Sequence, residues 1–389
     1  MLESTIVYGL LTIIMVICGC IASRRQLAYD RKFVTLKSRE KELSFAYLEI
    51  WLPILLFTFV FGCRYDVGID QLTYLKWYNG EMPDSKEFLW RHIAELLSSC
   101  GVHYAVYFGI WAFLQVFFLY YTIKNYRFLF PYVAFYLIVG NFFLSMMNTI
   151  RFSLVASVFF YATKYITNRQ FVKYCLCILV STLIHKTSIV LLVFYPIFAY
   201  KTKWFNIKCQ VLLLAVALFL WVNKELALNL LAYVFDFFID KFNYNSGYRY
   251  AFHGKLGTNI FNQSAKFGRN TGLGDYVFLF RGIVVMIYYN KMRKKYKSAL
   301  FDMSYTLWFV DFVAGFIVGK SYVISRPLLY LAPFKMLTLA YFTHYCFSSK
   351  KLQEQFMGVL FILIHFALFI NIVSMGEANK SAFTFFWQH

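Results

Sequence analysis

Residues 4–22 read STIVYGLLTIIMVICGCIA, a run without a charged side chain. Residues 355–374, QFMGVLFILIHFALFINIVS, form a second run of this kind. At a rise of about 1.5 Å per residue, a helix of this length crosses about 30 Å of hydrocarbon. A helix also satisfies its backbone hydrogen bonds within one segment, as lipid requires. These two stretches therefore predict membrane-spanning helices.

The composition of the whole chain supports this interpretation. Of its 389 residues, 60% are hydrophobic and only 15% are charged, whereas soluble domains are about 45–50% apolar and about 25% charged. The net charge of +20 would suit nucleic acid in a soluble protein, but basic cytoplasmic loops explain it here. We therefore exclude a soluble enzyme and expect no nucleic-acid partner.

Similar apolar runs recur along the chain and predict an all-α polytopic membrane protein that forms one domain over residues 1–389. Counting these runs gives about twelve spanning helices. The predicted helices cover residues 4–22, 45–62, 103–122, 130–147, 151–166, 174–185, 187–200, 209–222, 276–290, 299–319, 328–346 and 355–374.

Lysine and arginine concentrate in alternate connections between these helices. Six connections hold 22 of the 39 basic residues, namely 23–42, 124–127, 164–173, 201–208, 291–297 and 350–351. The positive-inside rule makes this set cytoplasmic, so both termini are expected on the outer side of the membrane. Two long connections, 63–102 and 223–275, then also lie on the outer side. Each contains an amphipathic pattern that predicts a helix lying in the membrane interface.

Several arginines fall at or near the predicted outer ends of separate helices. Arg64, Arg151 and Arg326 lie at such ends, and Arg281 lies about one and a half turns inside its helix. Any one of them fits a side chain that reaches for lipid headgroups. Together, on the less basic side, they predict an anion site, because guanidinium groups match diphosphate oxygens well.

Two further patterns place polar residues within apolar runs. One pattern interrupts a run, and the other consists of two charged residues at the same depth. His185-Lys186-Thr187-Ser188 breaks an apolar stretch near its outer end. Asp311 and Lys335 lie in consecutive helices, each about eight residues, or about 12 Å, from the outer end. This matching depth predicts a structural ion pair between the two helices.

Four blocks of residues resemble the EpsG-like branch of the Wzy-type polymerases, which join lipid-linked oligosaccharide repeats into surface polysaccharide. The blocks are Arg64-Tyr65-Asp66-Val67-Gly68-Ile69-Asp70 with Tyr74, Asn148-x-x-Arg151, His185-Lys186-Thr187-Ser188, and Arg326 with Tyr330. Phe152 departs from the family pattern, where Gln follows the arginine of the second block. A role for that glutamine is therefore not transferred.

The resemblance implies a multi-pass glycosyltransferase of the bacterial inner membrane, with a GT-C-like helical core and an active site facing the periplasm. Donor and acceptor would be glycans on undecaprenyl diphosphate, and a chain-length regulator would be an additional protein partner. The expected product is O-antigen or a related polysaccharide, made without a metal or other cofactor.

The resemblance and the charge pattern together give roles to individual residues. The catalytic candidates are Asp70, His185, Arg151 and Arg326, with Asp70 preferred over His185 as the base. The expected diphosphate ligands are Arg64, Arg151, Lys186, Arg281 and Arg326. The remaining substrate-binding candidates are Asp66, Tyr74, Asn148 and Tyr330.

Three other functions are compatible with parts of the pattern. An O-antigen ligase would share the topology, the lipid substrate and the outer arginines. A lipid-linked oligosaccharide flippase would show an approximate repeat and charge reaching both faces, neither of which the sequence shows. An acyltransferase is disfavoured because His185 lies among the outer arginines.

Overall fold

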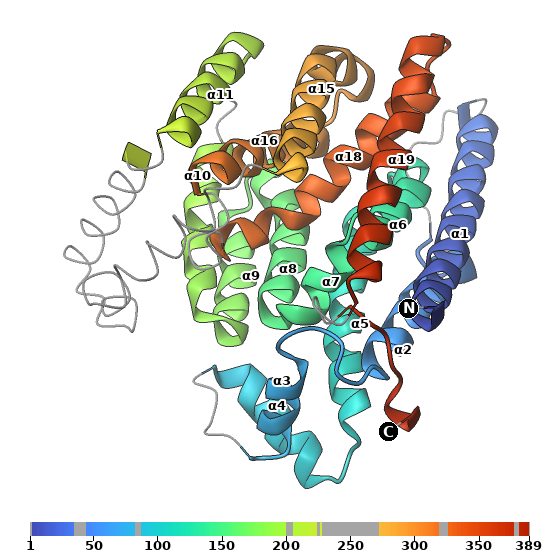
Figure 1. Cartoon of the computed structure of the whole chain (residues 1–389), viewed down its shortest axis with the longest axis vertical. Helices are drawn as coiled ribbons and strands as arrows, with labels where there is room; N and C mark the ends of the chain where they lie inside the picture. The colour runs from blue at the N-terminus through green and yellow to red at the C-terminus, as the bar shows by residue number, and fades with distance from the viewer. Residues whose placement is uncertain are drawn as a thin grey trace.

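The computed structural model describes residues 2–34, 44–81, 87–199, 205–223, 226–227, 272–318, 326–376 and 381–388. Within these ranges the regular elements are all helices (Figure 1), and the β-structure is confined to one isolated bridge between Arg64 and Phe385. The described part of the chain is therefore all-helical, as predicted.

The elements are α-helices, with 3-10 helices at four places along the described chain. They are α1 (Leu2–Val34), α2 (Leu48–Gly62), α3 (Gln71–Tyr78), α4 (Phe88–Ser99), α5 (Tyr104–Thr122), η1 (Arg127–Leu129), α6 (Phe130–Val139), α7 (Phe142–Asn148), α8 (Ile150–Thr167), α9 (Phe171–Ile184), η2 (Lys186–Val193), α10 (Phe194–Ala199), α11 (Ile207–Val222), α15 (Leu273–Tyr296), α16 (Ala299–Val318), η3 (Arg326–Leu331), α18 (Ala332–Phe347), α19 (Leu352–Ser374) and η4 (Phe386–Gln388). Each predicted run coincides with one of these helices or with two consecutive ones.

The number of full membrane spans is smaller than the number of predicted runs. Four helices in the described ranges are long and apolar enough to cross a membrane: Glu3–Ala28, Tyr104–Thr122, Ala299–Ile317 and Leu352–Ser374. A fifth span results if α6 and α7, bent by 60°, act together. Other apolar helices, such as α2 and α9, have only 10–17 residues. The chain is thus a multi-pass membrane protein, while the predicted count of about twelve spans is not confirmed.

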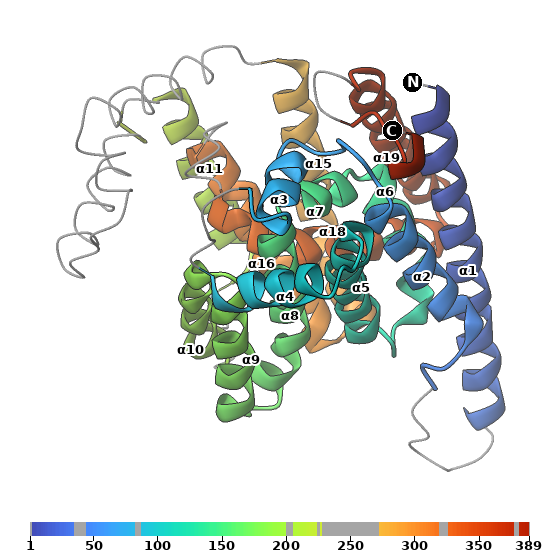
Figure 2. The same cartoon turned by 90° about the horizontal axis from the view of Figure 1, so that it is seen from below.

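The two ends of the described chain lie together. Phe383 N donates to Ser4 Oγ at 2.8 Å, and the Tyr8 hydroxyl donates to Ser381 O at 3.0 Å. Figure 2 shows both termini at the same end of α1. The placement of both termini on the periplasmic side of a membrane stays a prediction.

Predicted cytoplasmic connections gather at the other end of α1. Gln26 Nε2 donates to Asn125 O at 3.0 Å, and Phe128 stacks on Tyr296 with ring centroids 6.0 Å apart. These contacts join parts of three basic connections, 23–42, 124–127 and 291–297, or the residues beside them. Charge pattern and fold therefore agree on which segments share an end of the bundle.

A discontinuous helix supports the region where the sequence blocks meet. The run 130–147 breaks at Gly140 and Asn141, and a second break at Thr149 separates α7 from α8. Gln115 of α5 donates from Nε2 to Ile150 O at 2.9 Å and so satisfies a carbonyl near the second break. The two breaks leave Asn148 and Arg151 at adjoining helix ends.

One of the two predicted interfacial helices is present as a helix. α4 covers the predicted amphipathic stretch after residue 87 and buries Trp90 and Ala94. The second predicted helix and the rest of the connection 223–275 lie largely outside the described residues.

Candidate functional site

Arg64 fastens the first sequence block to the discontinuous helix. Its guanidinium donates to Phe61 O at 2.6 Å, Met147 O at 3.0 Å and Val67 O at 3.3 Å, and the side chain is fully buried. These carbonyls belong to the end of α2, the end of α7 and the loop between α2 and α3. In this conformation Arg64 is therefore a structural anchor, unlike the diphosphate ligand that the sequence predicts.

The loop after Arg64 turns back over the end of α7. Gly68 has a φ of 93°, which favours glycine, and Asp70 N donates to Asn148 Oδ1 at 2.9 Å. The side-chain oxygen of Asn148 thus holds the loop in place. Burial raises the pKa of Asp70, while the charges of Arg326 and Arg151 act to lower it. Blocks one, two and four are therefore within electrostatic reach of one another.

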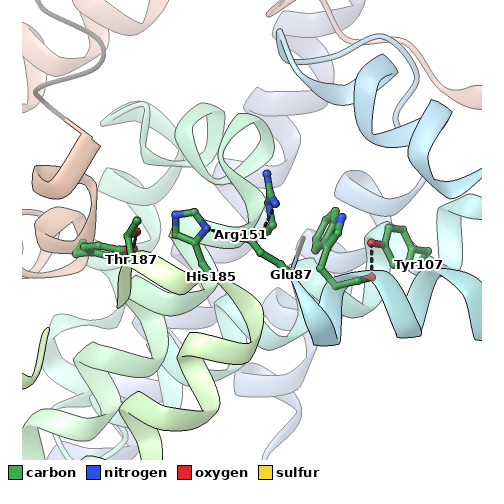
Figure 3. Close-up of polar contacts among 7 residues, drawn as sticks. Glu87, Tyr107, Arg151, His185 and Thr187 are labelled. Atoms are coloured by element: carbon green, nitrogen blue, oxygen red, sulfur yellow. Dashed lines mark hydrogen bonds and ion pairs between the residues drawn. The ribbon is translucent and has the colours of Figure 1, made fainter. Parts of the chain in front are cut away.

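Arg151, at the start of α8, is bonded to a carboxylate that the sequence analysis did not select. Its Nη1 donates to Glu87 Oε2 (Figure 3), and its Cζ lies 5.3 Å from the Trp77 ring centre and 5.6 Å from that of Trp90. Tyr74 lies at 5.8 Å and is itself buried. Aromatic rings and one carboxylate thus surround much of the guanidinium.

His185 bonds to the same carboxylate from the other side. It stands between α9 and η2 with extended backbone, where its Nδ1 pairs with Glu87 Oε1. Its Nε2 is buried and has no hydrogen-bond partner among the residues that the structure describes. Because the Nδ1 proton faces a carboxylate, Nε2 is the nitrogen that can accept a proton.

Glu87 is therefore the centre of the arrangement. It is 7% exposed, and burial would raise its pKa, but the hydrogen bond from His185 and the charge of Arg151 outweigh that effect and lower the pKa. Glu87 precedes the amphipathic stretch of α4, so its sequence context suggests only a helix-end charge. No local signal distinguished it, because its partners lie 64 and 98 residues away in sequence.

Phe152 and Tyr330 join the third and fourth blocks to α8. The Phe152 ring lies 4.0 Å from the His185 ring and 5.2 Å from the Tyr330 ring, and the Thr187 and Tyr330 hydroxyls are 2.7 Å apart. Arg326 begins η3, the same 3-10 helix that ends after Tyr330. The residue that departs from the family pattern thus fills an apolar junction between blocks.

The four sequence blocks consequently meet in one place. We use the name site cluster for Asp70, Glu87, Arg151, His185 and Arg326. Lys186 follows His185 as an exposed residue, and Asp66 adopts a left-handed φ of 50° in the loop before Gly68. In the part of the chain that the structure describes, no group of three or more His, Cys, Asp or Glu is arranged to hold a metal ion.

A small cavity lies beside the second helix break. It has a volume of about 20 Å³ and is lined by Ser145, Met146, Ser153, Leu329 and Pro333. That volume holds about one water molecule.

The remaining predicted residues form a separate group, which we name the helix-pair region. Lys335 Nζ of α18 pairs with Asp311 Oδ2 of α16 at 3.1 Å, as the matching depths predict. Arg281 Nη1 of α15 donates to His365 Nε2 of α19 at 2.9 Å, while His365 Nδ1 donates to Phe361 O at 2.7 Å. Arg281 thus contacts a neighbouring helix rather than Glu87, the carboxylate that pairs with Arg151.

A comparison with known proteins identifies the family to which this chain belongs. A model of the EpsG family matches residues 48–387, which include all four blocks and most of the chain.

The chain belongs to the EpsG family.

Membership of the EpsG family suggests a membrane protein of the polysaccharide polymerase type and a glycosyltransferase-like activity. No curated protein and no solved structure matches the chain. The roles of individual residues in this EpsG family member therefore depend on the geometry of its own site cluster.

Proposed function

We propose that this protein polymerises undecaprenyl-diphosphate-linked oligosaccharide repeats into O-antigen or a related surface polysaccharide. The reaction takes place at the periplasmic face of the bacterial inner membrane, within a GT-C-like helical core. The observation that carries the proposal is the meeting of Arg151, Arg326 and Asp70 with the Glu87–His185 pair, from segments far apart in sequence.

The donor diphosphate is bound by Arg151 and Arg326, and exposed Lys186, which follows His185 in the chain, is a further ligand. Preorganised cationic groups stabilise the charge that develops on a leaving group, and losing one such group costs about 100-fold in rate or more. Arg64 is excluded from this assignment because its guanidinium donates to three backbone carbonyls. Arg281 is excluded because it donates to His365.

The transfer step exchanges one bond to the anomeric carbon for another. An acceptor hydroxyl oxygen forms a bond to the donor anomeric carbon as the bond from that carbon to the diphosphate oxygen breaks. The electron pair of the broken bond leaves on the diphosphate, which the arginines face. The hydroxyl proton passes to His185 Nε2, the buried nitrogen opposite the one held by Glu87.

Asp70 is the second candidate for the proton. Burial raises its pKa, which makes its carboxylate a better proton acceptor. His185 is preferred on geometry because Glu87 fixes its orientation, whereas Asp70 faces two positive charges that stabilise its ionised form.

The proposal is tested by replacing Arg326 or Arg151 with Ala in the producing organism and separating its surface polysaccharide by gel. We expect single-repeat product to remain and the polymer ladder to disappear, at unchanged protein level in the membrane. A full ladder would remove that arginine from the mechanism. Loss of every lipid-A-linked glycan, including the single repeat, would favour an O-antigen ligase instead.

A further inference from the structure

Glu87 is one carboxylate with two functional partners. Its Oε2 accepts from Arg151 Nη1 and its Oε1 pairs with His185 Nδ1. A buried carboxylate is retained only when such partners compensate its desolvation. The arrangement joins a residue assigned to the diphosphate with a residue assigned to the acceptor hydroxyl.

The pairing with Glu87 neutralises Arg151 in the structure described. The Arg151 side chain is 19% exposed, so an incoming anion can reach the guanidinium. A diphosphate that accepts from the Nη1 donor held by Glu87 competes with that carboxylate, because two anions close together repel each other. A donor bound in this way takes the place of Glu87 at Arg151.

We propose that Glu87 is an internal counter-ion that the donor diphosphate displaces from Arg151, and that it keeps His185 in the tautomer that can accept the acceptor proton. This inference depends on the proposed function for the identity of the anion. Glu87 itself is a positioning residue, since it acts through Arg151 and His185.

The two roles of Glu87 predict opposite effects for one substitution. Glu87→Gln keeps the shape of the side chain but removes its negative charge, so Arg151 becomes available and anion affinity rises. The same amide no longer selects the His185 tautomer through a charge, so turnover falls. A residue that only supported the fold would lower affinity and turnover together.

The experiment uses the full-length protein, purified and placed in lipid nanodiscs, with undecaprenyl diphosphate as the probe. We expect Glu87→Gln to bind the probe about tenfold more tightly than the unmodified protein, within the usual range of coupling between sites. In cells the same variant should make about 100-fold less polymer, the typical contribution of a positioned base. Glu95→Gln is the matched control, because Glu95 lies on α4, the helix that Glu87 precedes, is exposed and lies 3.5 Å from Arg91.

A second variant separates loss of charge from loss of fit. Glu87→Asp retains the charge on a shorter side chain, so we expect probe affinity within about twofold of the unmodified protein and reduced polymer. Equal gains in affinity for Glu87→Asp and Glu87→Gln would overturn the counter-ion role. So would weaker probe binding by a Glu87→Gln protein with an unchanged unfolding temperature.

Failure of this inference is distinguishable from failure of the proposed function. If the unmodified protein binds the probe, Arg326→Ala does not, and Glu87→Gln gains nothing, only the inference about Glu87 is wrong. If neither the unmodified protein nor Arg326→Ala binds the probe, the proposed function is wrong and the counter-ion role is overturned with it.

Discussion

The site cluster and the helix-pair region both hold charge inside a largely apolar bundle, but they hold it in different ways. In the site cluster, Arg151 and His185 stand next to helix breaks and share one carboxylate. In the helix-pair region, Asp311 and Lys335 project from continuous helices and form a one-to-one pair. In the site cluster, two cationic side chains share Glu87, so ionic partners can be exchanged. In the helix-pair region, each charge has its own partner on the neighbouring helix.

This difference indicates which charges serve chemistry. A broken helix presents side chains and backbone groups that need support from elsewhere, and Arg64 and Gln115 supply it at the end of α7 and the start of α8. A continuous helix needs no such support, so a charge within it is stabilised by a single partner on the next helix.

The largest effect is expected where the broken helix is anchored. Replacing Arg64 with Lys keeps a positive charge but cannot reproduce three donations to carbonyls of three segments. Leaving buried carbonyls without partners should lower the free energy of unfolding by about 3 kcal/mol. The unfolding temperature of the purified protein in detergent measures this, and protein level in the membrane should fall with it.

Arg91→Lys on α4 is the control for Arg64→Lys. Arg91 has a side chain 38% exposed, and its Nε lies 3.5 Å from Glu95, so its replacement should change stability by less than about 0.5 kcal/mol. If Arg64→Lys were as stable as this control but lost polymer, Arg64 would belong to the chemistry after all, as the sequence first suggested.

The sequence predicted the regular parts of the molecule better than the site. Apolar runs locate helices because lipid imposes a length and an apolar surface on each one, and the Asp311–Lys335 pair followed from equal depth in regular helices. The depth of a residue in the membrane does not show which neighbouring helix its side chain faces. The sequence therefore assigned Arg281 and Arg151 to one diphosphate site, although Arg281 bonds to His365 on α19. The carboxylate of Glu87 depends on tertiary contacts alone and was missed.

A smaller effect is expected from reversing the ion pair of the helix-pair region. Asp311→Lys or Lys335→Asp alone places two like charges together, and each should cost about 2 kcal/mol in the free energy of unfolding. The double reversal should recover most of that loss and restore normal polymer. The unfolding temperature and the polysaccharide ladder are the measurements.

The Arg91–Glu95 pair again provides the comparison, because its side chains are 38% and 54% exposed and its reversal should be nearly neutral. A double reversal at positions 311 and 335 that stays as unstable as the single variants would show that these charges interact with more than each other. The helix-pair region would then resemble the site cluster, and the distinction between the two regions would be wrong.

The smallest effect on polymer is expected at Arg281, where the two regions can be compared most directly. Arg281→Gln removes a charge but leaves an amide that can donate toward His365 Nε2, the acceptor that Arg281 uses at 2.9 Å. We expect polymer within about threefold of normal and a stability change of about 1 kcal/mol, whereas Arg326→Gln in the site cluster should abolish the ladder. Both substitutions replace one guanidinium with the same amide. Loss of the ladder in Arg281→Gln at normal protein level would show that Arg281 acts with Arg151 and Arg326 on the diphosphate. The distinction between charges at helix breaks and charges in continuous helices would then be wrong.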